Sequence, residues 1–453
     1  MNVGACSVRV GVVPRRCRAA LSSPLPSAFS SAFSSSRPFP SSPTPSPLLA
    51  TSRLGQGADV ICGRTSGYRG IVSVSVSQKG QAFGAGLTGF FAEAYRSGLS
   101  SKKQVAMASK ITDWVKPGDP SGEFKRQAST FRDWISDEPG AKFPPEKGRY
   151  HLYVSYACPW ATRTLIVRKL KGLEDFISFS SVHWHMGENG WRFPTPADTD
   201  AAGENVVPDP VPGHEGYTHL RQVYLGVDPA YAGRFTVPVL FDKQTGVIVN
   251  NESSEILRML GHAFDSQLPP EAASARALDL YPEQLRAAID EAHAWTYDKI
   301  NNGVYKSGFA TTQEAYERNV TALFDALDRA EKHLAKTGGP FFFGDQITEV
   351  DVRLFPTLIR FDPVYVQHFK CNLRDIRSGY PHLHAYTRRL YWQHAAFGDT
   401  TNFLHIKNHY TRSHPQINPF SITPLGPVPD ILPLDDEVPA AKAAVAAATG
   451  KAS

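Results

Sequence analysis

One cysteine of the chain has the sequence context of a reactive thiol, within Tyr156-Ala157-Cys158-Pro159-Trp160-Ala161. The residues before it, 150–155, have the character of a strand, and residues 159–170 have that of an amphipathic helix. Because proline is favoured at the first position of a helix, Cys158 is predicted to cap the helix N-terminus. Backbone N–H groups and the helix dipole stabilise a thiolate there, so we expect its pKa to fall from about 8.5 toward neutrality or below.

The residue three places after this cysteine is Ala161, where a dithiol redox motif has a second cysteine. No disulfide can form within the motif, so a mixed disulfide on Cys158 has to be resolved by an external thiol. The alternative interpretation is an inert, buried cysteine that precedes a helix beginning with proline.

Two further segments have the character of a site for a small peptide. A cis Pro238 before a predicted strand would leave the N–H and C=O groups of Val237 free to pair with an extended peptide. Asn251-Glu252-Ser253-Ser254 opens a predicted helix, where the free N–H groups suit a carboxylate and Glu252 suits an ammonium group. An ordinary helix cap is the alternative for this segment.

The elements that must position these residues follow the order strand, helix, strand, hairpin and helix, which is typical of a thioredoxin-type domain. A long insert, 187–233, separates the second strand from the hairpin, and we expect it to be functional or lid-like. Its one predicted helix lies near 217–225. The predicted elements are strand 150–155, helix 159–170, strand 176–182, hairpin 237–241 and 247–249, and helix 252–259.

After Leu268-Pro269-Pro270 the pattern changes to long helices. Thr348 is predicted to cap one of them, with Asp351 as its capping-box partner and Ile347 packed against Val352. The fold class is therefore α/β plus all-α, a thioredoxin-like N-terminal domain followed by an all-helical domain. The predicted helices are 282–301, 313–336, 349–365 and 381–393.

The charge of the chain is unevenly distributed. Residues 1–58 are rich in Ser and Pro and hold six arginines but no Asp, Glu or Lys. We expect a disordered transit peptide, for a chloroplast rather than a mitochondrion, with an untargeted low-complexity arm as the alternative. Six of the 48 basic residues lie there, which leaves 42 against 43 acidic residues in the rest. This near-neutral body argues against a nucleic-acid partner.

The remaining composition excludes other kinds of site. No stretch approaches the roughly 20 apolar residues of a membrane span, so we expect a soluble folded part. Cys158 and Cys371 are the cysteines of the predicted folded body, too few for a cysteine zinc site, and His183 and His185 are interpreted as structural. We therefore expect no metal.

The predicted segments are a leader 1–58, a transitional part 59–110, the thioredoxin-like domain 111–266, the helical domain 267–422 and a disordered tail 423–453.

Several blocks of sequence, in order from about residue 114 to 419, resemble the glutathione transferase superfamily and more closely the glutathionyl-hydroquinone reductases, or xi class. The blocks are Gly122-Glu123-Phe124-Lys125-Arg126-Gln127, Gly148-Arg149-Tyr150-His151-Leu152-Tyr153-Val154-Ser155-Tyr156-Ala157-Cys158-Pro159-Trp160-Ala161, Gly190-Trp191-Arg192-Phe193, Asn301-Asn302-Gly303-Val304-Tyr305-Lys306, Asp351-Val352-Arg353-Leu354-Phe355 and Ile406-Lys407-Asn408-His409-Tyr410.

The resemblance implies an enzyme that removes glutathione from glutathionyl-hydroquinones through a cysteine–glutathione mixed disulfide, with glutathione as co-substrate and a homodimer as the assembly. It implies that Cys158 is the nucleophile and that Tyr305 and Tyr410 line the quinol pocket; aromatic residues that only pack helices are the alternative for both tyrosines. It also implies a glutathione site formed by Trp191, Arg234, Val237, Glu252 and Ser253.

One departure from the family concerns Thr162, where the family commonly has histidine, and we expect it to change the pKa of the cysteine modestly. Other functions remain open from the residues alone. They are a dehydroascorbate reductase or thioltransferase, a conjugating glutathione transferase, and a non-catalytic ligand carrier.

Overall fold

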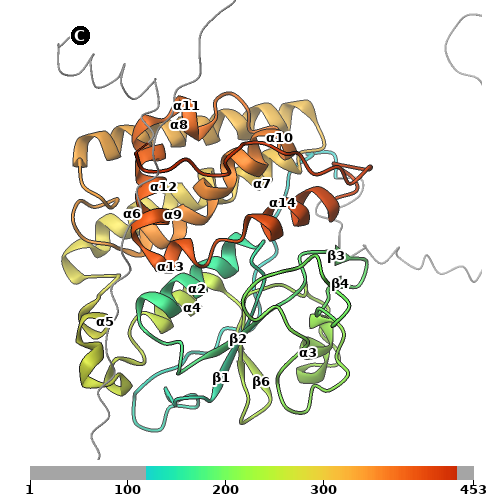
Figure 1. Cartoon of the computed structure of the whole chain (residues 1–453), viewed down its shortest axis with the longest axis vertical. Coiled ribbons are helices and arrows are strands. Elements are labelled where there is room, and N and C mark those ends of the chain that lie inside the picture. Colours follow the sequence, from blue (N-terminus) through green and yellow to red (C-terminus); the bar gives the residue numbers. More distant parts are fainter. Residues whose placement is uncertain (1–118, 436–453) are drawn as a thin grey trace, which may run out of the picture. The chain divides into compact units, whose positions relative to one another are not determined.

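The computed structural model describes residues 119–435, and the predicted leader and transitional part lie outside them. Its main sheet has four strands in the order β2-β1-β5-β6. The sheet lies below helices α2 (Pro159–Leu170) and α4 (Ser253–Leu260) in the view of Figure 1. Strand β1 pairs in parallel with β2 and antiparallel with β5, and β5 and β6 form the predicted hairpin. The strands are β1 (Tyr150–Val154), β2 (Ser178–Ser181), β5 (Val239–Asp242) and β6 (Val247–Asn250).

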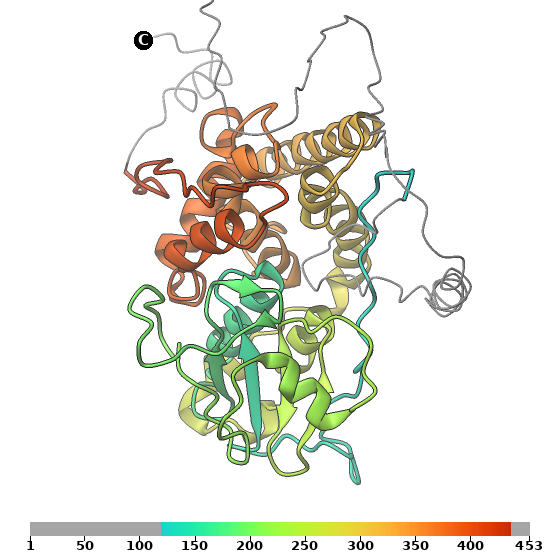
Figure 2. The same cartoon turned by 90° about the vertical axis from the view of Figure 1, so that its right-hand side faces the viewer.

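Helix α2 (Pro159–Leu170) connects the two parallel strands and has the predicted bounds. It packs on α4 (Ser253–Leu260), and both lie between the sheet and the helical region (Figures 1 and 2). All five residues of β1 are buried, because this strand has neighbours on both edges and both faces are covered. The thioredoxin-like arrangement predicted from the sequence is confirmed.

The long insert is more structured than predicted. It contains α3 (Leu220–Val227), close to the expected helix, and a two-stranded sheet of β3 (Met186–Gly187) and β4 (Gly190–Trp191). Because each of these strands has only two residues, the alternation of apolar and polar positions was too short to predict them. The hairpin places Trp191 in a buried position.

The helical region agrees with the predicted helices but divides two of them. The first ends in a π-helix, η4, and the third ends in another, η5, which contains Pro363. Proline has no N–H group to donate, so the regular hydrogen-bond ladder cannot continue there. Two unpredicted helices, α7 and α14, carry Tyr305 and Tyr410. The elements are η1 (Asp265–Gln267), η2 (Pro270–Ala272), α5 (Ala273–Ala277), η3 (Glu283–Leu285), α6 (Arg286–Thr296), η4 (Tyr297–Asn301), α7 (Gly303–Gly308), α8 (Gln313–Thr337), α9 (Glu349–Arg360), η5 (Phe361–Tyr365), α10 (Val366–His368), α11 (Ile376–Gly379), α12 (Pro381–Gln393), α13 (Ala395–Gly398) and α14 (Phe403–Arg412).

The start of α9 has the predicted capping box. The carboxylate of Asp351 accepts hydrogen bonds from the Thr348 N–H (2.7 Å) and hydroxyl (3.1 Å). It also accepts bonds from the Phe342 N–H and the Tyr386 hydroxyl, both at 2.8 Å. This buried carboxylate therefore fixes the start of α9 and joins it to α12.

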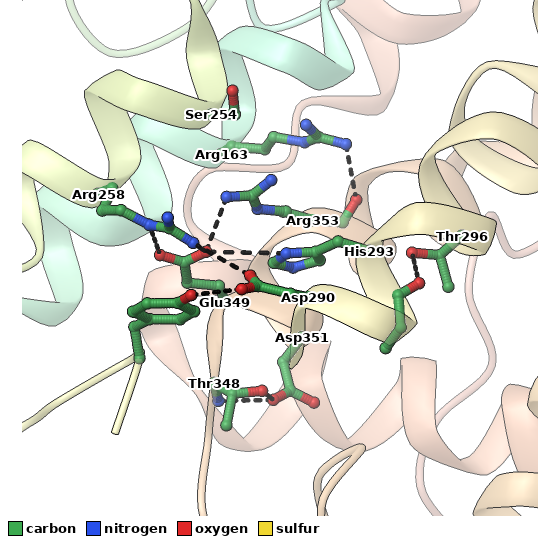
Figure 3. A network of polar contacts seen from close by, with 12 residues as sticks. Arg163, Ser254, Arg258, Asp290, His293, Thr296, Thr348, Glu349, Asp351 and Arg353 are labelled. Carbon is green, nitrogen blue, oxygen red and sulfur yellow. Dashed lines mark hydrogen bonds and ion pairs between the residues drawn. The ribbon is translucent and has the colours of Figure 1, made fainter. Parts of the chain in front are cut away.

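A network of charged side chains connects the sheet region to the helical region (Figure 3). Its centre is Glu349, whose buried carboxylate accepts two bonds from Arg258 of α4 (2.8 and 2.9 Å) and one from Arg353 of α9 (2.7 Å). Arg163 of α2 donates to the Arg353 carbonyl at 3.2 Å. The network thus joins α2 and α4, which pack on the sheet, to α9 of the helical region, and it fixes how these two regions lie against each other.

The predicted loose tail is wrong for residues 423–435. Arg377 donates to the Pro429 carbonyl, Lys407 pairs with Asp430, and Trp392 donates to the Leu432 carbonyl. The Pro-rich composition prevents a helix there, but the carbonyl groups still accept bonds from helices α11, α12 and α14. Residues 436–453 lie outside the described part. Among the described helices, none has the length and apolar character needed to cross a membrane.

Candidate active site

A cavity of about 360 Å³ lies between the sheet region and the helical region. All eight residues predicted from the sequence line it, although they come from six separate segments of the chain. The structure therefore brings together every member of the predicted site. These residues are Cys158, Trp191, Arg234, Val237, Glu252, Ser253, Tyr305 and Tyr410.

Cys158 occupies the predicted N-cap position of α2, in an extended backbone conformation, with Pro159 at the first helical position. Cys158 as a whole residue is partly exposed and borders the cavity. It donates a hydrogen bond to the carbonyl of Val237 at 3.5 Å, and the Val237–Pro238 peptide bond is cis. The sulfur therefore lies between the helix start and the strand that begins at Val239.

The expected low pKa of Cys158 is not found in the structure. Burial raises the pKa of the thiol above its ordinary value, because a thiolate loses solvation there. The N–H groups of Ala161 and Trp160, followed by the guanidinium groups of Arg360 and Arg126, lower the pKa but do not outweigh burial. The helix-end effect on the thiol is therefore as predicted from the sequence, whereas the loss of solvation depends on the tertiary structure.

The sheet side of the cavity also contains the start of α4. Glu252 is its N-cap, and its carboxylate accepts bonds from the N–H (3.1 Å) and hydroxyl (2.9 Å) of Ser254. The hydroxyl of Ser129 donates to the same carboxylate at 3.1 Å. Ser253 is buried at the first helical position. A negative charge and the free N–H groups of a helix thus lie side by side, as expected for a ligand that has both charges.

The helical side is formed by a chain of tyrosine hydroxyl groups. The Tyr410 hydroxyl lies 2.5 Å from that of Tyr305 and 3.0 Å from that of Tyr365. Burial raises the pKa of Tyr305 and raises that of Tyr410 well above the usual value of about 10. Both side chains are therefore neutral at physiological pH. Their mutual bond uses one of the two hydroxyl protons, so the pair can donate at most one hydrogen bond to an oxygen in the cavity.

His409 of the helical side packs against Trp191 of β4. His409 stacks on Trp191 with ring centroids 4.7 Å apart and donates from Nδ1 to the Trp184 carbonyl at 2.8 Å. This bond leaves Nε2 as an acceptor. Burial lowers the pKa of His409 to about 3, so the ring is neutral.

Sequence reasoning missed several residues of the cavity. Arg126 lies over the rings of Trp160 (4.5 Å) and Tyr305 (5.0 Å), and its Nε donates to Asn302 at 2.8 Å. Arg126 and His409 belong to segments that carry the family resemblance, which was the available signal for them. Nothing in the local pattern indicated a site role for Tyr297, which lies where the predicted helix 282–301 becomes the π-helix η4. The missed lining residues include Arg126, Trp160, Tyr297, His409 and His414.

The residue that departs from the family, Thr162, does not line this cavity. It is fully buried in α2, and its hydroxyl donates to the Cys158 carbonyl at 3.0 Å. The same hydroxyl accepts a bond from Arg360 at 2.9 Å. Thr162 is therefore connected to the cysteine through the backbone rather than through the sulfur.

One group of potential metal ligands occurs in residues 119–435, namely His183, Asp198 and Asp200. The N–H of His185 donates to Nδ1 of His183, which makes Nε2 the protonated nitrogen that faces the two carboxylates. Asp198 is also paired with Arg192 at 2.7 Å. A protonated Nε2 and an arginine pair do not suit a metal ion, so this group is better described as a structural ion cluster. Cys371 is fully buried.

Comparisons with known proteins agree with this geometry. Residues 157–263 match the model of the glutathione S-transferase N-terminal domain, and residues 313–389 match that of the C-terminal domain. The chain is 48% identical to the glutathionyl-hydroquinone reductase YqjG of Escherichia coli, over 70% of this chain and 93% of that protein.

Two solved structures are also similar. A xi-class glutathione S-transferase from Phanerochaete chrysosporium has 60% identity and a TM-score of 0.63, and the match covers 69% of this chain and 100% of that one. The xi transferase ECM4 of Saccharomyces cerevisiae, solved in complex with glutathione, has 47% identity and a TM-score of 0.64, with the same coverage of 69% and 100%.

Proposed function

The chain belongs to the glutathione S-transferase superfamily, in the group of xi-class transferases and glutathionyl-hydroquinone reductases, and we propose that it removes glutathione from glutathionyl-hydroquinones. The observation that carries the proposal is the position of Cys158, a thiol at a helix N-terminus on the border of a cavity. In residues 119–435 the other cysteine is the fully buried Cys371. No resolving thiol is therefore present in that part of the chain, and we propose that an external thiol resolves the mixed disulfide.

The proposed reaction has two thiol-exchange steps. The Cys158 thiolate attacks the sulfur of the thioether, a sulfur–sulfur bond forms, and the bond between that sulfur and the ring carbon breaks. The ring carbon takes up a proton, and the hydroquinone leaves. The thiolate of a second glutathione then attacks the glutathione sulfur of the mixed disulfide, which releases oxidised glutathione and regenerates Cys158.

Glutathione is proposed to lie along the sheet side of the cavity. Its γ-glutamyl end has a carboxylate and an ammonium group, which suit the α4 N-terminus at Ser253 and the Glu252 side chain. Its cysteinyl unit lies next to Val237, whose carbonyl already accepts a bond from the Cys158 thiol. Trp191 and Arg234 are proposed to complete this site.

The hydroquinone is proposed to lie against the hydroxyl groups of Tyr305 and Tyr410. Burial keeps both hydroxyl groups protonated, and their mutual bond uses one of the two protons. The pair is therefore proposed to donate one hydrogen bond to a quinol oxygen and stabilise negative charge that develops as the thioether bond breaks. Their mutual bond of 2.5 Å fixes their orientation toward the cavity.

The test is turnover of three substrates by the wild type and by Cys158→Ser. We expect the wild type to prefer glutathionyl-hydroquinone over dehydroascorbate and a chloro-dinitro aromatic, and Cys158→Ser to lose turnover of the first. Mass spectrometry is expected to find a glutathione adduct on Cys158 after reaction. Equal or better turnover of the chloro-dinitro aromatic, or unchanged activity of Cys158→Ser, would reject the proposal.

Two further parts of the proposal concern assembly and location. A homodimer is expected from the family resemblance, and the molar mass of the purified protein in solution tests it. Import into a chloroplast is expected from the six arginines and the lack of acidic residues in 1–58. A fusion of this segment to a fluorescent protein tests it, and a fusion that stays in the cytosol would contradict it.

A further inference from the structure

Arg360, the last residue of α9, is a fully buried cation behind the cysteine. Its Nε donates to the carbonyl of Ala157 at 3.1 Å, and Nη2 donates to the carbonyl of Tyr156 at 2.8 Å and the hydroxyl of Thr162 at 2.9 Å. Nη1 donates to the Pro356 carbonyl at 2.8 Å. An arginine of the helical region thus holds both sides of the turn that carries Cys158.

The acceptors of Arg360 are all neutral. Within residues 119–435, no carboxylate lies at ion-pair distance from its guanidinium group. Burial of a positive charge without an anionic partner lowers the stability of the folded protein, unless a nearby negative charge compensates for the lost solvation. The thiolate of Cys158, two residues after Tyr156, is the anion that this charge can stabilise, and the Arg360 charge does act to lower the pKa of that thiol.

We infer that Arg360 is a positioning residue, which holds the turn around Cys158 in place and supplies the constant positive charge that favours its thiolate. This inference rests on the proposed role of Cys158 as the nucleophile. Thr162 extends the connection, since its hydroxyl accepts from Arg360 and donates to the Cys158 carbonyl. A threonine fits this role because it can accept and donate at once.

Other charged and titratable groups face the same cavity. Arg126 also acts to lower the pKa of Cys158, but it is partly exposed at the cavity wall and a bound substrate can change its surroundings. Arg360 is fully buried, so substrate binding does not change its surroundings and its charge acts on the sulfur throughout the reaction. The remaining groups are Arg132, Arg234, Glu252, Tyr297, Tyr305, His409, Tyr410 and His414.

Arg168 provides a matched control. It lies on the same helix as the cysteine turn, is buried, and donates to the backbone carbonyls of Ile177 (2.6 Å) and Glu174 (2.9 Å). It comes ten residues after Cys158, which is about 15 Å along a helix at 1.5 Å per residue. Loss of Arg168 therefore removes a similar set of structural bonds without removing a charge near the sulfur.

The experiment measures how the alkylation rate of Cys158 by iodoacetamide depends on pH, followed by mass spectrometry of the peptide that contains Cys158. We compare full-length wild type, Arg360→Gln, Arg360→Lys and Arg168→Gln. We expect the pH midpoint of alkylation to rise by about one unit in Arg360→Gln, which corresponds to a tenfold smaller thiolate fraction near neutrality. In Arg360→Lys we expect the midpoint to rise less, because the positive charge is kept. Arg168→Gln is expected to keep the wild-type midpoint.

Equal midpoints for Arg360→Gln and Arg360→Lys, or an equal rise in Arg168→Gln, would overturn the inference. If Arg360→Gln does not fold, Thr162→Val replaces it; a raised midpoint supports the connection through the hydroxyl, and a wild-type midpoint overturns it. The alkylation assay uses no quinol substrate. A result that overturns the role of Arg360 is therefore distinguishable from a failure of the proposed function, which is measured by turnover of Cys158→Ser.

Discussion

The two sides of the cavity are built in different ways. The sheet side consists of places where the chain enters a new element: Cys158 before α2, Val237 before β5 and Glu252 before α4. Its polar groups are largely main-chain N–H and C=O groups or side chains that cap them. The helical side consists of side-chain hydroxyl groups, Tyr305 and Tyr410, which come from helices 105 residues apart in sequence.

This difference suggests a division of roles. Most substitutions leave main-chain groups in place, so the sheet side suits the part of the reaction that stays the same, which is binding of glutathione. Side-chain groups change with single substitutions, so the helical side suits the part that varies, which is the group attached to glutathione. If this division holds, a substitution on one side of the cavity leaves the function of the other side unchanged. Only a substitution in the network that connects them affects both.

The connection is expected to give the largest effect. Glu349→Ala leaves Arg258 and Arg353 without their shared carboxylate, and we expect the free energy of unfolding to fall by about 4 kcal/mol. Urea denaturation measures it. As the control, Glu291→Ala breaks an exposed pair with Arg329 and is expected to cost less than about 1 kcal/mol. Similar losses in both variants would show that the buried network does not hold the two sides together.

Acid is expected to weaken the helical region, where burial lowers the pKa of His368 and His405 to about 4 and of His409 to about 3. The folded protein keeps these rings neutral, whereas in the unfolded chain they take up protons below about pH 6.5. The free energy of unfolding is therefore unaffected by these rings above that pH and decreases as the pH falls toward 4. At pH 5 the decrease is about 2 kcal/mol for each ring.

His405→Leu tests this expectation because it removes one of the titrating rings and keeps an apolar side chain. Between about pH 7.5 and about pH 5, we expect its free energy of unfolding to fall by about 2 kcal/mol less than that of the wild type. Equal losses in the two proteins would contradict the assignment of acid sensitivity to this ring.

On the sheet side, Glu252→Gln removes a negative charge and keeps an oxygen that can cap α4. We expect the KM for glutathione to rise about tenfold, equivalent to about 1.4 kcal/mol, because the ammonium group loses its partner. Glu255→Gln is the control, since Glu255 lies on the same helix and pairs with Arg132 and Asn250. A rise in KM of equal size in both variants would reject a specific role for Glu252.

On the helical side, Tyr410→Phe removes the hydroxyl that joins Tyr305 and Tyr365. We expect kcat for glutathionyl-hydroquinone to fall about fivefold, consistent with the loss of about 1 kcal/mol from one hydrogen bond, while the KM for glutathione is unchanged. Tyr365→Phe is expected to have a smaller effect, since Tyr365 bonds to Tyr410 but does not line the cavity. A larger change in the KM for glutathione than in kcat would contradict the proposed division of the two sides.

Much of the fold follows from local sequence signals. The bounds of α2 and α12 agree with the prediction, and the capping box of Thr348 and Asp351 is as expected. Short helices such as α7 and α14 were missed because a few turns bounded by glycine or polar residues give a weak periodic signal. The tyrosines they carry were predicted through family resemblance and not through the pattern of the helices.

The order of the residues along the chain determined which groups lie at the ends of which elements, because caps, turns and strand starts depend on neighbours within a few positions. That was enough to identify Cys158, Val237 and Glu252 as members of one site. It could not determine the solvation of the cysteine, nor that Arg360 would lie behind it, 202 residues later in the chain. Burial and long-range electrostatics depend on which segments meet in space, so only the folded structure decided them.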